Sequence, residues 1–309
     1  MEVSHEPKEL YTHNSPLCGC DNNKLKGVWA DVVIVMDTSA VDDSAATIRS
    51  FLIALVNATN IGQGEGQHSR IGIINGGSKA TIFANLTKYQ NTREATEDIK
   101  KLPMLGGSIF RADLALEAAK EVFDIEVANG RRTHFKKIVI LFSTRGFDCA
   151  KSKSLKMKVD EDYACRIASH MKSSGITIIT VARKVSSTDY PSIDLGTPCY
   201  KMNQDNDYAA NIVNLLCKAN CYCEPDFSLV TNEDDCNQIY SECVYFSIAQ
   251  MNYDSARNHC ISMGAGLSNV FSKEKDKFLY GVVQTSCKMF PNFHNKENRH
   301  FCRLTAPAR

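Results

Sequence analysis

The chain has 309 residues, and its 36 lysines and arginines against 35 aspartates and glutamates give a formal net charge of +1. This balance excludes the basic surface of a nucleic-acid-binding protein. Hydrophobic residues make up 43% and charged residues 23%, which is typical of globular domains and excludes long disordered tracts. Every apolar run is far shorter than the roughly 18 residues of a membrane-spanning helix, so we expect no membrane span.

In chain order, the first part alternates between short apolar runs and amphipathic stretches. The β-branched run at 31–37 is typical of a strand buried on both faces, and the apolar spacing of 44–57 predicts a helix. Residues 70–74 and 81–86, on either side of a Gly-Gly turn, predict a hairpin. A long helix is expected from Ser108 to about Gly130.

The same alternation continues with a buried strand at 137–142, a helix at 160–174 ended by Gly175, a strand at 176–182 and a helix at 207–216. Strands that alternate with helices of this length predict a doubly wound, mainly parallel α/β sheet. After Cys223 the composition changes to a cysteine-bearing α+β stretch with a helix at 253–263 and another that starts near Ser272. We therefore divide the chain into an N-terminal segment (1–24), an α/β domain (25–218), a Cys-rich linker (219–231) and a C-terminal module (232–309).

The 13 cysteines indicate the compartment, because most of them cluster at the start and in the last third of the chain. Such clusters indicate either disulfides or zinc ligands, and the spacings C-x-C and C-x-x-x-C without a nearby histidine favour disulfides. The N-x-T triplets at Asn57 and Asn85 are candidate glycosylation sites. Residues 1–30 show no signal sequence, so either the recorded start misses it or the protein is not exported. Because the cysteine clusters favour disulfides, we expect an extracellular, secreted protein.

The α/β part resembles a von Willebrand factor A domain. The resemblance rests on Asp37-Thr38-Ser39 after the first strand, Gly106-Gly107-Ser108 before the long helix, the buried strand at 137–142, and residues 165–182. The stretch 216–223 is similar to the exit of this domain in secreted nematode-type proteins that pair it with a C-type lectin domain. The resemblance runs in order over residues 29–218.

The resemblance implies a metal-ion-dependent adhesion site at the carboxyl ends of the strands, built from Asp-x-Ser-x-Ser, a threonine and a second aspartate. Asp37 and Ser39 match this pattern. Val41 has no ligand oxygen, Phe110 falls at or beside the threonine position, and Thr144 stands where the second carboxylate belongs. We therefore expect a degenerate site, no bound metal and no cofactor, with the Asp37 carboxylate accepting backbone N–H bonds or pairing with Arg145.

The last third resembles the opening of a C-type lectin domain, from Cys236 to Ser268. The single tryptophan, Trp29, lies in the other domain, so the tryptophan-bearing motifs of that family are absent. Phe290-Pro291-Asn292 lacks the acidic residue of its calcium loop. We expect a partial, lectin-like module without calcium-dependent sugar binding.

Disulfide pairings are implied by these resemblances. In an A domain the last helix returns beside the first strand, so Cys18 and Cys20 are expected to pair with members of the group Cys217, Cys221 and Cys223. Cys165 is a possible partner of Cys199. The lectin resemblance implies an opening pair, Cys236 and Cys243, and a bond from Cys260 to Cys302. Cys287 is then the odd thiol.

No sequence motif of a zinc protease, serine hydrolase or P-loop nucleotide enzyme is present. Asp37 at a strand end is the one candidate nucleophile, but its neighbours Thr144 and Arg145 offer no second acid or lysine. We predict a non-enzymatic interaction or adhesion protein with an extracellular protein or glycan partner. The alternative is a carbohydrate-binding lectin that acts without calcium, with a link to host defence implied by the resemblance alone.

Overall fold

The computed structural model describes residues 20, 27–39, 43–64, 68–103, 109–128, 132, 135–150, 159–184, 189–220, 227–230, 242–247, 249, 251–270, 273, 275–276, 279–280 and 300–305. Of the residues singled out above, the following lie outside this set: Cys18, Val41, Gly106 to Ser108, Gly130, Cys221, Cys223, Cys236, Ser272, Cys287 and residues 290–292.

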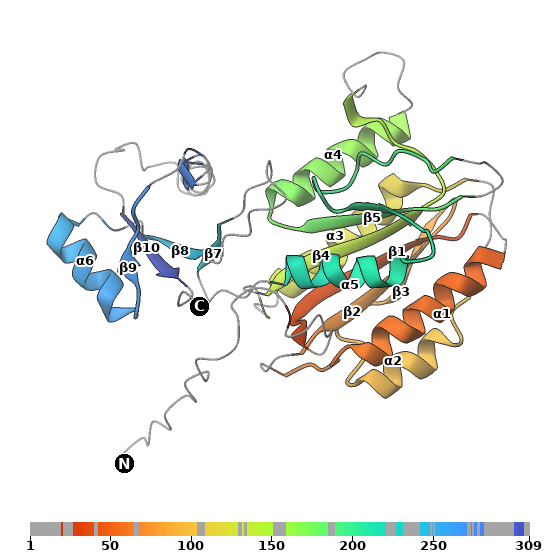
Figure 1. The fold of residues 1–309 in the computed structure, drawn as a ribbon, viewed down its shortest axis with the longest axis horizontal. Helices are drawn as coiled ribbons and strands as arrows, with labels where there is room; N and C mark the ends of the chain where they lie inside the picture. Colours follow the sequence, from red (N-terminus) through yellow and green to blue (C-terminus); the bar gives the residue numbers. More distant parts are fainter. Residues whose placement is uncertain are drawn as a thin grey trace.

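The first part of the chain folds into a six-stranded sheet with helices on both faces (Figure 1). The strand order is β3-β2-β1-β4-β5-β6, and every neighbouring pair is parallel except β2 and β3. The elements are β1 (Ala30–Asp37), α1 (Asp43–Ala58), β2 (Arg70–Gly76), β3 (Ala80–Ala84), α2 (Thr92–Ile99), α3 (Ala112–Ala128), β4 (Lys136–Ser143), α4 (Val159–Ser173), β5 (Thr177–Ala182), β6 (Lys201–Asn203) and α5 (Tyr208–Ala219). The doubly wound, mainly parallel fold and the hairpin are thus confirmed.

The two faces of the sheet bury two separate hydrophobic clusters, because alternate residues of a strand point to opposite faces. Ile34 and Ile140 belong to the cluster that α1, α2 and α5 cover. Val35 and Leu141 belong to the cluster that α3 and α4 cover. β1 is buried along its whole length, which explains its unbroken β-branched sequence.

Two elements are missing from the sequence prediction, and one begins later than expected. The omitted helix α2 carries a recognisable signal, because Asn91 caps the backbone N–H of Glu94 and the Glu94 carboxylate accepts the N–H of Gln90. The omitted strand β6 has only three residues. Helix α3 begins at Ala112 rather than near Ser108. One reason is that the Arg111 N–H bonds to the Gly77 carbonyl of the hairpin turn.

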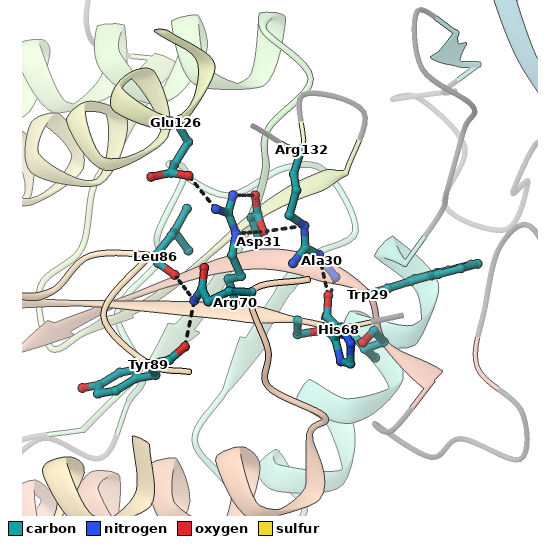
Figure 2. A network of polar contacts seen from close by, with 12 residues as sticks. Trp29, Ala30, Asp31, His68, Arg70, Leu86, Tyr89, Glu126 and Arg132 are labelled. Carbon is teal, nitrogen blue, oxygen red and sulfur yellow. Dashed lines mark hydrogen bonds and ion pairs between the residues drawn. The ribbon is translucent and has the colours of Figure 1, made fainter. Parts of the chain in front are cut away.

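A buried ionic network fixes the amino ends of β1 and β2 (Figure 2). Arg70 donates to both oxygens of Asp31, at 2.8 and 2.5 Å, and to Glu126 of α3 at 2.5 Å. Burial lowers the pKa of Arg70, but its bonds with Asp31 and Glu126 more than reverse this, so the guanidinium stays charged. Arg132, at a φ of 48°, stacks on Phe135, and burial lowers its pKa to about 10.

The later part of the chain holds a second, antiparallel sheet in the order β7-β8-β10-β9. Its strands are β7 (Ser228–Leu229), β8 (Glu242–Ser247), β9 (Gly266–Leu267) and β10 (His300–Thr305). Helix α6 (Tyr253–Ser262) is the helix expected at 253–263, and Asn252 caps it by accepting the N–H of Ser255. The C-terminal strand therefore lies between β8 and β9.

Candidate functional site

The carboxyl ends of β1, β4 and β5 meet at one edge of the large sheet, which we call the crown. Asp37 ends β1, Thr144 follows β4, and Arg183 follows β5. Because parallel strands place their carboxyl ends together, loops from distant parts of the sequence converge here. Ligands of open α/β sheets bind at this edge.

The Asp37 carboxylate is buried and fully engaged by the chain itself. Oδ1 accepts the Ser39 N–H at 3.0 Å and its hydroxyl at 2.6 Å. Oδ2 accepts the Thr144 N–H at 2.8 Å and its hydroxyl at 2.5 Å. The carboxylate therefore ties the loop after β1 to the loop after β4. Of the residues of the implied metal site, the structure thus brings Asp37, Ser39 and Thr144 into direct contact.

Phe110 lies just before α3 with its side chain in the core rather than in solvent. Its ring packs on Gly76 at the end of β2, so closely that a Cβ on Gly76 would lie 2.7 Å from Phe110 Cε2. The Gly76 carbonyl accepts the N–H and the hydroxyl of Thr38. The aromatic ring thus fills space beside the loop that carries Asp37.

Arg145 does not pair with Asp37, and this alternative from the sequence is wrong. Its guanidinium contacts Asp160 at 3.2 Å and Glu161 at 2.5 Å, both in the first turn of α4. It also donates to the Phe110 carbonyl at 3.3 Å. The two carboxylates on α4 offer Arg145 free acceptors, whereas the Asp37 oxygens are already occupied.

Arg183 is a second cation at the crown, and sequence reasoning missed it. Its side chain is buried and donates to the Asp37 backbone carbonyl at 2.8 Å and to the Gln204 side chain at 3.2 Å. The available signal was its position, because it directly follows the buried run 177–182 and so had to lie at the same sheet edge as Asp37.

The donors at the crown can be compared with what a divalent ion needs. Mg²⁺ requires near-octahedral oxygen ligands and negative charge to offset its dehydration. Asp37, Ser39 and Thr144 supply one carboxylate and two hydroxyls, and these three groups already satisfy one another. Among the described residues, no group of three or more His, Cys, Asp or Glu side chains could hold a metal ion. The donor set present therefore does not fit the ion that the family's site implies.

Two disulfides are defined by the structure. Cys20 bonds to Cys217 of α5, which is one of the pairings left open by the sequence. Cys165 of α4 bonds to Cys149, so its expected pairing with Cys199 is wrong. Cys149 had been left out of the candidates, although it follows β4 in the loop that faces α4. Cys199, Cys243 and Cys260 are also disulfide-bonded, and the bond from Cys260 to Cys302 stays a prediction.

The two candidate glycosylation sites differ in their surroundings. Asn85 is exposed in the loop between β3 and α2, and its side-chain oxygen accepts the hydroxyl of Thr87. Asn57 lies near the end of α1, where its side-chain oxygen accepts the Thr96 hydroxyl at 2.8 Å. The sequon threonine Thr59 is buried and bonds to Leu55. The Asn85 sequon is thus the more accessible one.

Comparison with solved structures finds proteins of low sequence identity. Proximal thread matrix protein 1 from the mussel byssus is 18% identical, with a TM-score of 0.47 over 62% of this chain and 47% of that protein. A form of it with a zinc occupied MIDAS motif is also 18% identical, with a TM-score of 0.49 over 64% of this chain and 48% of that protein. The manganese-loaded TRAP protein of Plasmodium vivax is 14% identical, with a TM-score of 0.45 over 72% of this chain and 87% of that protein. The present chain thus spans about half the length of the mussel protein.

A family model gives the assignment. The von Willebrand factor type A domain model matches residues 31–235, about two thirds of the chain, and this range includes every strand and helix of the six-stranded sheet except the first residue of β1. In the part of the chain that the structure describes, no helix is long and apolar enough to cross a membrane. The chain belongs to the von Willebrand factor type A domain family.

Proposed function

We propose that this chain is a secreted, non-enzymatic interaction protein whose A domain binds its partner without a metal ion. Domains of this family generally serve adhesion and protein interaction, and the family and its disulfides are typical of extracellular proteins. The observation that carries the metal-free part is the Asp37 carboxylate, which accepts four hydrogen bonds from Ser39 and Thr144.

Electrostatics support the same proposal. A divalent ion at Asp37 would have no second carboxylate to neutralise its charge, because Thr144 occupies that position. It would also approach the buried cation Arg183, which bonds to the Asp37 backbone. Arg145 supplies a further positive charge at the rim, although Asp160 and Glu161 offset it. Binding an ion here would require breaking four internal hydrogen bonds for an incomplete set of ligands.

Isothermal titration with Mg²⁺, Mn²⁺ and Ca²⁺ tests this proposal on the full chain. We expect no saturable binding at sub-millimolar concentrations. The matched gain-of-function control is the triple variant V41S, F110T and T144D, which restores the family's ligand types at all three altered positions. Sub-millimolar binding by the unmodified chain that Asp37→Ala abolishes would contradict the proposal.

A second candidate function is glycan binding by residues 232–309 without calcium. Its support is the four-stranded antiparallel sheet with α6 and the disulfide-bonded cysteines Cys243 and Cys260, which match the order of elements expected from the lectin resemblance. A glycan array probed with the full chain in EDTA tests it. Specific signals that persist in EDTA would favour this function, and a folded protein without any signal would remove it.

A further inference from the structure

Exposed apolar side chains of the A domain gather along one line, between α3 and α4. Five large hydrophobic residues of this domain are exposed among those described, and four of them line two pockets there: Ile109, Ile125, Val159 and Tyr163. Their exposed fractions run from 39% for Tyr163 to 83% for Val159. The fifth, Ile82, lies on the edge strand β3. Scattered apolar residues need no explanation, but a continuous group of them indicates a contact surface.

The two pockets adjoin each other at Tyr163. The first, of about 910 Å³, opens at the crown beside Ser39, Thr144 and Arg145. The second, of about 920 Å³, lies between the outer faces of α3 and α4. Tyr163 lines both pockets, and its hydroxyl contacts Glu117 across the two helices at 3.3 Å. We call the two adjoining pockets together the α3–α4 groove.

The walls of the α3–α4 groove are acidic. Five carboxylates line the two pockets and Glu161 and Asp162 lie beside them, against four lysine or arginine side chains: the lining carboxylates are Asp113, Glu117, Glu121, Asp124 and Asp160. The cations at the groove are already paired: Lys120 with Asp124, Arg166 with Asp162, Arg111 with Asp113, and Arg145 with Asp160 and Glu161. Glu121 forms no ion pair with any described residue and faces the groove. A partner would therefore meet apolar anchors bordered by uncompensated negative charge.

We infer that the α3–α4 groove binds a basic, amphipathic segment of a partner protein, with its apolar side on Ile125, Tyr163 and Val159 and its lysines or arginines over the acidic walls. Opposite charge steers such a segment to the groove, and burial of the apolar anchors supplies most of the affinity. A groove between two helices is the geometry that receives an amphipathic helix. This inference rests on the proposed interaction function and adds the surface and the chemistry of the partner.

Fluorescence anisotropy of labelled peptides on the full chain tests the inference. The probe is a synthetic peptide of about 14 residues with leucine and lysine at helical spacing. The first control peptide replaces every lysine by glutamate, and the second replaces every leucine by serine. We expect the leucine–lysine peptide to bind in EDTA, both control peptides to bind at least about tenfold more weakly, and the affinity to fall between about 0.05 and 0.5 M NaCl.

Groove variants give the location. The double variant I125S and V159S removes two exposed anchors, and we expect it to weaken binding at least about tenfold. I82S is the matched control, because Ile82 is similarly exposed but lies on β3, and its affinity should stay unchanged. For the charges, E117Q with E121Q should weaken binding and reduce its salt dependence, whereas E97Q on α2 should not. Circular dichroism verifies that each variant is folded.

The outcomes separate the two proposals. Peptide binding that requires Mg²⁺ would overturn the metal-free function. Absent binding, or binding in EDTA that the groove variants leave unchanged, would overturn the groove alone. The sequence of residues 151–158 contains four lysines, which could compete with the peptide for the acidic walls. The variant K151S, K153S, K156S and K158S is therefore also measured. Binding that appears only in this variant would mean that the chain supplies its own basic occupant, and it would likewise overturn the inference.

Discussion

Replacing Asp37 by alanine distinguishes a structural carboxylate from a metal ligand. In the structure this side chain accepts four hydrogen bonds, two from the backbone N–H groups of Ser39 and Thr144 and two from their hydroxyls. Because Ser39 and Thr144 are only partly buried, their hydroxyls can turn to water after the substitution. The two N–H groups lose a charged acceptor, at a cost of about 1–3 kcal/mol each. We expect D37A to lower the free energy of unfolding by roughly 2–6 kcal/mol.

The effect of magnesium on stability completes this test. An ion that binds only the folded chain adds RT ln(1 + [L]/Kd), which is about 2.7 kcal/mol at a ligand concentration of 100 Kd. We expect about 10 mM Mg²⁺ to add nothing to the unmodified chain, because no site of about 0.1 mM affinity is formed.

Urea unfolding followed by circular dichroism, with disulfides intact and in EDTA or Mg²⁺, measures both quantities. S39A and T144V, which each remove one hydroxyl, serve as matched controls and should cost about 1 kcal/mol. The reasoning is refuted if D37A is as stable as the unmodified chain in EDTA while Mg²⁺ stabilises only the unmodified chain. That pattern belongs to a metal ligand.

Four further predictions follow from other parts of the molecule. R70M leaves Glu126 buried without its cation and leaves Asp31 with only the more distant Arg132, at 3.8 Å. Urea unfolding should therefore show a loss of about 3–5 kcal/mol that shrinks as the pH falls from neutrality and the carboxylates are protonated; an unchanged stability at pH 7 would contradict this. Removing the Cys149–Cys165 bond with the double serine variant should cost about 3 kcal/mol by the same measurement, since the bond closes a loop with a sequence separation of 16. In protein from a secretory host, enzymatic deglycosylation and mass spectrometry should find a glycan at Asn85, and N85Q should remove it; an unmodified Asn85 would contradict its assignment as an accessible acceptor. Burial raises the pKa of Asp98, but bonds from Lys88 and Tyr89 lower it more. The ionised carboxylate therefore stabilises the fold at pH values above its unfolded-state pKa of about 4, and this stabilisation is lost as the pH falls through the lower pKa of the folded state. D98N should cost about 1 kcal/mol at pH 7 and progressively less in acid.

The pattern of the sequence predicts the sheet well where burial is two-sided. The run 31–37 has no polar alternation, so only a central strand accommodates it, and the structure places it between β2 and β4. The three-residue strand β6 has no such pattern, because its ends are exposed and its pairing to β5 depends on the preceding loop. Helix α2 is short, but its Asn91 and Glu94 capping pair was legible in the sequence.

At the crown, the sequence predicts which loops meet but not which side chains pair. Asp37 and Thr144 had to lie close together, because β1 and β4 are parallel and adjacent. The partners of Arg145 depend on how α4 is placed after the loop, and this placement follows from the Cys149–Cys165 bond and from packing against α3. The local sequence around Arg145 shows neither this disulfide nor this packing contact. Of the two alternatives for Asp37, the structure therefore has the backbone N–H bonds and not the pairing with Arg145, which contacts Asp160 and Glu161.

The contacts at the crown bear on the proposed metal-free function, because they join loops that a bound ion would otherwise join. A bound cation would join the loops after β1 and β4 through shared oxygen ligands, and here the Asp37 carboxylate joins the same loops through Ser39 and Thr144. The cysteine bond and the Arg145 ion pairs then fasten the β4 loop to α4. The mouth of the α3–α4 groove is thus held by a disulfide and by ion pairs. A preorganised surface loses less conformational entropy on binding. The proposed recognition along the helices would use these fixed loops, whereas at the crown centre the Asp37 oxygens already accept hydrogen bonds from Ser39 and Thr144.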